Sequence, residues 1–344
     1  GRRQAMILTI AMMSGGSFAI AALPTFAVAG WIAPILLLLA RILQGMSMGG
    51  EVSNASAYLA EIAPNDRRGR YSSFYYISTG TAILLASLLG AYLTFVLDDD
   101  QLSSWGWRVP FVIGGLLGVV GLWMRRGMAE ADNQERNAVK AKAVRNPLWM
   151  TMKHHPRAVL QVVGFVLLAT LAYYTFFSAM TPYAVKQRGA EANDVFVALS
   201  IATAMFVALQ YPMGALADRI GRKPQLLTYA ALFAILIVPL SKLIGPSFVK
   251  LLIVFCVGLL LFAMCSAIIP AVLAEAFPAE LRGVGIGAWY NLTVALFGGT
   301  APLLVNALSD AGHADWFFYY LAAAAVISFL TMVWMPEKRG QDLD

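Results

Sequence analysis

Residues 214–223 read GALADRIGRK and join the end of one long apolar run to the start of the next. Gly214 and Gly221 permit a tight turn and a close approach of backbones. Asp218 lies where the first run ends. The cations that follow it are Arg219, Arg222 and Lys223. The stretch predicts a short, charged hinge between two membrane helices. A plain cationic anchor is the alternative, although such anchors need no fixed spacing of Gly and Asp.

The composition excludes an ordinary soluble domain. Of 344 residues, 59% are apolar and 13% are charged, whereas soluble domains have about 25% charged residues. The net charge of +6 comes from short loops without interleaved aromatic residues, which argues against a nucleic-acid partner. Cys256 and Cys265 fall in one apolar run and would point to opposite helix faces. We therefore expect neither a disulfide nor a metal site from this pair. No cofactor is implied.

The apolar residues form ten runs, each of which reaches or approaches the ~20 residues that cross a bilayer. Only helices satisfy their own backbone in lipid at this length, so an all-α membrane protein is expected. The expected spans are roughly 5–23, 34–60, 71–97, 108–127, 158–184, 195–217, 225–244, 248–273, 284–308 and 314–335.

The distribution of cations predicts the orientation of these spans. If the chain starts inside and alternates, inner segments hold 19 of the 25 Lys and Arg residues and outer segments hold 5, with Arg41 inside a span. Cytoplasmic loops carry an excess of Lys and Arg. Both ends of the chain are therefore expected on the cytoplasmic side.

An internal repeat predicts two parallel halves. Residues 61–69 read EIAPNDRRG and residues 275–283 read EAFPAELRG, and both fit Glu, two residues, Pro, three residues, Arg, Gly. Repeats of the same order and membrane sense are typical of transporters built from two related halves. The expected parts are an N-terminal half at 1–124, a polar cytoplasmic segment at 125–157 and a C-terminal half of six helices at 158–344.

The repeat also predicts what precedes the chain. Gly1-Arg2-Arg3 looks like the end of a second copy of the 214–223 stretch. By symmetry with the second half, two further helices would come before it. We therefore expect that the chain is truncated at its N-terminus and holds ten of twelve helices.

The second span carries polar residues that suit a cavity wall. An Arg inside a span costs at least ~2.5 kcal/mol unless it faces protein or water, and Arg41 lies in the run 41–51. On a helix Gln44 and Glu51 share one stripe, with Arg41 about 60° to its side. These three residues are predicted to line a pathway for substrate or protons. The alternative is that Arg41 and Glu51 only lock helices together.

Further polar groups lie inside the apolar runs, where they avoid lipid. Tyr290 and Asn291 are the strongest of these candidates for a lining role. The others are Tyr75, Tyr76, Gln161, Tyr173, Tyr174 and Gln210. Tyrosines near span ends are also typical interface anchors.

Charged residues at inner helix ends form a second candidate group. Glu61 with Arg68 and Glu275 with Arg282 flank the prolines of the repeat. Together with the 214–223 stretch these charges can form a cytoplasmic ion-pair network. Plain interfacial anchoring is the alternative.

Four stretches together resemble the major facilitator superfamily, and within it the metabolite:H+ symporter family. The stretch 214–223 is similar to the loop signature of the superfamily, and residues 43–51 read LQGMSMGGE. The other two are 105–111, WGWRVPF, and 290–302, YNLTVALFGGTAP. The resemblance implies that Arg41 takes part in proton coupling. It also implies that Asp218, Arg222, Glu275 and Arg282 act as a latch that holds the inner gate shut.

The resemblance implies a plasma-membrane importer that moves a small organic acid or a zwitterion by proton symport and alternating access, with no enzymatic activity. The expected partners are that substrate, H+ and membrane lipid, and a monomer is expected. Efflux antiporters of the same fold usually carry a glycine-proline signature in the fifth helix. The matching span, 71–97, contains Gly80 and Gly90 but no Pro, so an efflux antiporter is disfavoured. A membrane-embedded enzyme and a fragment that transports nothing by itself are the remaining alternatives.

Overall fold

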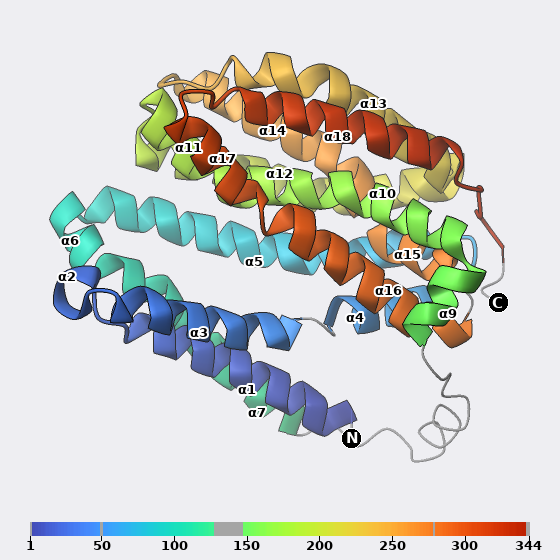
Figure 1. The fold of residues 1–344 in the computed structure, drawn as a ribbon, viewed down its shortest axis with the longest axis horizontal. Coiled ribbons are helices and arrows are strands. Elements are labelled where there is room, and N and C mark those ends of the chain that lie inside the picture. The colour runs from blue at the N-terminus through green and yellow to red at the C-terminus, as the bar shows by residue number, and fades with distance from the viewer. Residues whose placement is uncertain (1, 49–50, 127–146, 278, 342–344) are drawn as a thin grey trace. The chain divides into compact units, whose positions relative to one another are not determined.

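The computed structural model describes residues 2–48, 51–126, 147–277 and 279–341, and every regular element in these ranges is a helix (Figure 1). The chain forms two compact units. Unit 1 comprises residues 1–52 and 93–145, and unit 2 comprises residues 53–92 and 146–344. The division into two repeated halves rests on the sequence repeat and stays a prediction.

Unit 1 is a bundle in which α1 packs against both α3 and α7. Gly118 lies against Ser14, and the Ser14 hydroxyl donates to the carbonyl of Gly115 at 2.7 Å, so small residues let α1 and α7 approach closely. Its helices are α1 (Arg2–Ala21), α2 (Phe26–Ala29), α3 (Ile32–Met48), α6 (Asp99–Ser104), η1 (Gly106–Arg108) and α7 (Val109–Arg126).

Unit 2 is the larger bundle, and fully buried aromatic side chains such as Phe165, Phe176, Phe206, Phe233 and Phe262 fill its core. Two of its helices, α4 (Glu51–Ile62) and α5 (Arg68–Val96), begin or end beyond the division. The others are α9 (Pro147–His154), α10 (Pro156–Tyr174), η2 (Thr175–Ala179), α11 (Met180–Arg188), α12 (Ala192–Ile220), α13 (Arg222–Ser241), α14 (Phe248–Ser266), α15 (Ile269–Ala276), α16 (Ala279–Thr293), η3 (Val294–Gly298), α17 (Ala301–Asp310) and α18 (Trp316–Val333).

Eight helices in the described residues are long and apolar enough to cross a membrane. These spans are 68–96, 106–123, 156–188, 192–220, 222–241, 248–276, 286–310 and 316–333. Two expected spans correspond to shorter apolar helices, at 7–21 and 32–47. The apolar runs therefore predicted the helices, while the count of ten crossings stays a prediction.

Within the described residues, three of the expected spans are interrupted, which the apolar runs did not reveal. The π-helical turns η2 and η3 interrupt the spans 156–188 and 286–310. The span 248–276 breaks at Ala267 and Ile268, between α14 and α15, and Pro270 stands in the first turn of α15. Proline has no N–H to donate into the preceding turn, which accounts for the break.

Candidate functional site

The 214–223 stretch forms the sharp connection between α12 and α13. Gly221 stands between the two helices with a φ of 101°, a conformation that favours glycine. A side chain at this position would also meet the Glu337 carboxylate at 2.6 Å. That carboxylate accepts the backbone N–H groups of Arg222 at 3.2 Å and of Lys223 at 2.8 Å. Glu337 therefore caps α13, and glycine is required for both conformation and space.

Asp218 binds the N-terminus of α5. Its carboxylate is buried and accepts the backbone N–H groups of Gly69 at 2.8 Å and of Arg70 at 3.1 Å. Helix N-termini favour negative charge, because the first N–H groups have no partner within the helix. The same carboxylate lies 3.6 Å from Nη2 of Arg222 and 3.8 Å from Nε of Arg70. Asp218 thus links α12 to both α5 and α13.

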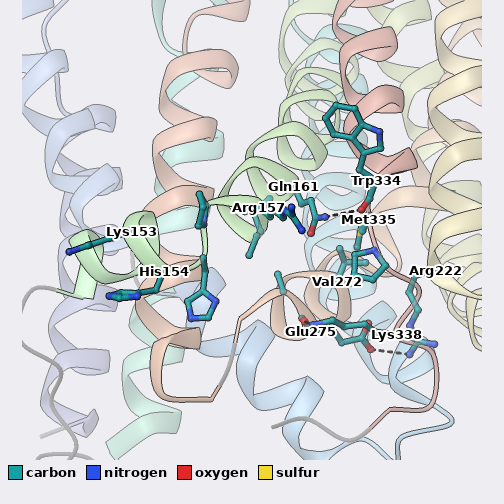
Figure 2. Close-up of a pocket in the computed structure, with 16 residues that line it drawn as sticks. Lys153, His154, Arg157, Gln161, Arg222, Val272, Glu275, Trp334, Met335 and Lys338 are labelled. Atoms are coloured by element: carbon teal, nitrogen blue, oxygen red, sulfur yellow. Dashed lines mark hydrogen bonds and ion pairs between the residues drawn. The ribbon is translucent and has the colours of Figure 1, made fainter.

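Glu275 joins this group from α15. Its Oε1 lies 3.3 Å from Nη2 of Arg222 and 3.6 Å from Nη1 of Arg68 (the Arg222 pair is drawn in Figure 2). The side chains of Arg68, Asp218, Arg222 and Glu275 are all 4% exposed or less. We call these four residues the charge cluster. Buried charges of this kind require partners, so removing one member leaves another charge buried without compensation and destabilises the fold.

Two glycines bring the backbones of α5 and α12 together next to the charge cluster. A Cβ added at Gly214 would meet the Gly69 carbonyl carbon at 2.8 Å and the Arg70 nitrogen at 3.1 Å. A Cβ added at Gly69 would meet the Gly214 carbonyl oxygen. The N–H groups of Gly69 and Arg70 reach Asp218 because the helices approach this closely. The fixed Gly–Asp spacing in the sequence therefore has a geometric basis.

The sequence interpretation missed the segment that follows α18. Besides the Glu337 cap, Lys338 donates through Nζ to the carbonyl of Glu275 at 2.5 Å, and Arg68 donates through Nη1 to the carbonyl of Gln341 at 2.6 Å. Residues 337–341 thus contact three elements that carry the charge cluster. The run Glu337-Lys338-Arg339 just beyond the last apolar run was the available signal.

The structure contains part of the predicted ion-pair network. The structure brings Asp218, Arg222 and Glu275 together with Arg68, which was also a predicted member of the network. Arg219, in contrast, is exposed. The side chains of Arg282 and Glu61 lie outside the part of the structure that is described. Lys223 contributes its backbone N–H to the Glu337 cap. The ion-pair contacts are therefore observed, and the gating role stays a prediction.

Arg41 and Gln44 form a polar group within unit 1. Arg41 donates through Nη1 to Oε1 of Gln44 at 3.1 Å, and Gln44 donates through Nε2 to the Ser17 hydroxyl at 3.0 Å. The Arg41 guanidinium lies 5.5 Å from the centre of the Phe111 ring. Glu51 begins α4, and its side chain lies outside the described residues. Of the three predicted members of the polar stripe, Arg41 and Gln44 thus lie on α3 and contact each other.

Tyr290 belongs to a cluster of aromatic side chains in unit 2. It hydrogen-bonds with Tyr76, and the ring of Tyr76 packs edge-on against Phe262 with a centroid distance of 6.0 Å. Tyr173 also packs against Phe262, at 6.2 Å. The next residue on α16, Asn291, donates to the Gly287 carbonyl at 2.5 Å. Further members of the cluster are Tyr75, Tyr174 and Phe177.

Two of the polar candidates serve the packing of unit 2. Gln210 is fully buried and donates to the Ser266 hydroxyl at 3.0 Å, which ties α12 to the end of α14. Gln161 donates to the carbonyl of Trp334 at 3.1 Å. Gln210 is enclosed by protein, whereas Gln161 also lines a cavity next to the start of α10.

The Glu337 cap gives a first stability prediction. Replacing Glu337 with Ala removes the acceptor for two N–H groups at the start of α13 and should lower the free energy of unfolding by about 1 kcal/mol. The measurement is thermal unfolding of the purified chain in detergent. Glu191→Ala is the matched control, because Glu191 precedes α12 without a side-chain cap bond. Equal shifts in both variants would contradict the cap.

Comparison with known proteins shows which family the chain matches. The model of the Major Facilitator Superfamily matches residues 1–292 and 166–343. The chain is 37% identical over 98% of its length to the alpha-ketoglutarate permease of Escherichia coli, covering 78% of that protein. It is 33% identical over 98% of its length to the citrate-proton symporter of Klebsiella pneumoniae, covering 76% of it. A putative proline/betaine transporter of Staphylococcus haemolyticus is 32% identical over 96% of this chain, which covers 71% of that protein.

Solved structures show the same fold. A crystal structure of a D-xylose-proton symporter superposes over 100% of this chain and 83% of its own, with a TM-score of 0.74 at 20% sequence identity. The outward conformation of another transporter of the superfamily, FucP, covers 96% of this chain and 82% of its own with a TM-score of 0.62. These likenesses support an all-helical transporter fold.

Proposed function

The chain belongs to the major facilitator superfamily, and from that premise we propose that it imports a small organic acid or zwitterion together with protons. Family membership makes it a membrane transporter and not an enzyme, and the resemblance to the metabolite:H+ symporter family is confirmed by the relatives. The observation that carries the proposal is similarity along nearly the whole chain to proteins named for α-ketoglutarate, citrate and proline or betaine.

The proposed mechanism is alternating access in the plasma membrane. In this proposal the chain crosses the membrane ten times, so both ends lie on one side. The excess of Lys and Arg in inner segments supports the cytoplasmic side. The two repeated halves rock around a site near the midplane. The driving force is the differential binding of substrate and proton to the two states.

Roles for the site residues follow from this proposal. Arg41, held by Gln44, supplies positive potential for a carboxylate or tunes a neighbouring proton site. Glu51 is the acid in the same stripe that exchanges the proton. Tyr290 and Asn291 lie on α16 in or next to the aromatic cluster, which supports a role in lining the substrate pathway. The charge cluster closes the cytoplasmic side in one of the two states.

Uptake into proteoliposomes tests the proposal. Labelled α-ketoglutarate, citrate, shikimate, proline and betaine are offered with an inward proton gradient, and then with a protonophore. Accumulation of one compound that the protonophore abolishes is the expected result. Uptake that only equilibrates and ignores the protonophore would contradict symport, and export against the gradient would indicate an antiporter.

Glu51→Gln is expected to separate proton coupling from substrate binding. The amide cannot carry the proton, so accumulation driven by a pH gradient should be lost, while exchange of labelled for unlabelled substrate without a gradient should persist. Glu191→Gln, an exposed change at the start of α12, is the control. Full pH-driven accumulation by Glu51→Gln would remove Glu51 from the proton path.

A further inference from the structure

A cavity of about 730 Å³ opens in unit 2 beside the charge cluster. Its walls come from the end of α9, the start of α10, the α15 helix and the segment after α18 (Figure 2). Glu275 is the one carboxylate among the described residues that line it. The basic side chains and imidazoles on its walls are Lys153, His154, His155, Arg157, Arg222 and Lys338. The cavity therefore has the charge of an anion-binding site.

Arg222 is the buried basic group of this cavity. Its side chain is 2% exposed and forms ion pairs with Asp218 and Glu275 at 3.6 and 3.3 Å. None of its three guanidinium nitrogens makes a hydrogen bond within the described residues. A buried donor without a hydrogen bond is costly. The guanidinium thus has donor capacity left for a ligand.

The start of α10 adds positive potential at the mouth of the cavity. His155, Pro156, Arg157 and Ala158 line it, and His155 makes no side-chain cap bond to the helix. The first turn of a helix presents N–H groups without partners and the positive end of the helix dipole, which suits phosphate. Lys153 and Arg157 are exposed beside this turn. The buried Arg222 guanidinium and the exposed side chains of Lys153 and Arg157, which we call the basic rim, thus line the same cavity.

We propose that this cavity binds a phosphate group, and that the bound group competes with Asp218 and Glu275 for the Arg222 guanidinium. Arginine binds the tetrahedral oxyanion through two parallel N–H bonds, and each contact is charge-assisted. A soluble phosphate ion and an anionic lipid headgroup carry the same chemistry. The site lies on unit 2 alone, so the proposal does not depend on which metabolite is transported.

Binding is measured on the full chain in detergent at constant ionic strength. Trp334 lines the cavity and is 76% exposed, so its fluorescence should report the ligand, and Trp334→Phe identifies its signal. One arm titrates inorganic phosphate, and a second titrates phosphatidylglycerol into the micelles with phosphatidylcholine as the neutral comparison. Saturation by phosphate indicates a soluble ligand, and saturation by phosphatidylglycerol alone indicates a headgroup. No saturation in either arm overturns the proposal.

A pair of charge-matched variants tests the location. Lys153→Gln with Arg157→Gln should weaken binding by about tenfold, because two cations leave the rim. Lys242→Gln with Lys250→Gln, at two exposed lysines that do not line the cavity, should leave binding unchanged. Equal weakening by both would mean a nonspecific charge effect and overturn the proposal. Lys338→Gln is the second cavity variant if the double variant aggregates, and unchanged binding there would also overturn it.

Discussion

Replacing Asp218 with Asn should reduce the initial rate of proton-driven uptake by about a hundredfold. The buried carboxylate holds the N-terminus of α5 through two hydrogen bonds and pairs with Arg222 at 3.6 Å. Removing one partner of a buried ion pair costs about 3 kcal/mol or more, which is about a hundredfold in a conformational equilibrium. Asparagine keeps the shape of the side chain, so the loss arises from the charge.

Thiol labelling distinguishes a latch from a purely structural contact. In a chain with Cys256 and Cys265 replaced by Ala, a cysteine at Ala276 reports access to the space beside Glu275. Asp218→Asn should accelerate its reaction with a membrane-impermeant maleimide applied from the cytoplasmic side. Arg219→Gln, an exposed change one residue away, should leave both uptake and labelling unaltered. Unchanged uptake and labelling in Asp218→Asn would refute the latch.

Replacing Gly214 with Val should lower the midpoint of thermal unfolding by roughly 10 °C, because overpacking and the loss of buried contacts add together. A Cβ at this position would lie 2.8 Å from the Gly69 carbonyl carbon. The added side chain must push α5 away from α12, which separates Asp218 from the N–H groups that it accepts. Uptake should be lost at temperatures where the variant is still folded.

The matched control for this variant is Ala208→Val, which adds the same bulk on an exposed position of α12. Its unfolding midpoint should stay close to that of the unmodified chain. Similar shifts in the two variants would mean that valine disturbs α12 itself. A normal midpoint in Gly214→Val would show that α5 and α12 do not touch at the two glycines.

The sequence predicted the four residues of the charge cluster as candidates, but not their partners elsewhere in the chain. Asp218 and Arg222 are four residues apart across the turn at Gly221, so their proximity follows from the short connection. Glu275 was predicted from the sequence repeat, which indicated a charged end on a second helix. The partners of Asp218 on α5 are 148 and 149 residues away, and no spacing rule specifies such a pair. Residues 337–341 were missed for the same reason.

The apolar runs predicted where helices exist but not how they are interrupted. A hydropathy run has no feature that distinguishes an α-helical turn from the π-helical turns η2 and η3. In both places bulky and small residues meet, as where Phe176 packs directly on Gly258. The polar stripe of α3 was easier to predict, because Arg41 and Gln44 lie one turn apart in one helix.

The break after Ser266 allows α15 to rotate as a short lever, that is, as a rigid segment hinged at Ala267 and Ile268. This helix has eight residues, and Glu275 lies next to its far end. At a rise of 1.5 Å per residue the lever is about 12 Å long, so a rotation of about 15° at Ala267 and Ile268 moves its tip by about 3 Å. That displacement is comparable with the 3.3 Å between Glu275 and Arg222. A rotation of these eight residues alone would therefore separate Glu275 from Arg222, while α14 keeps its packing in the bundle.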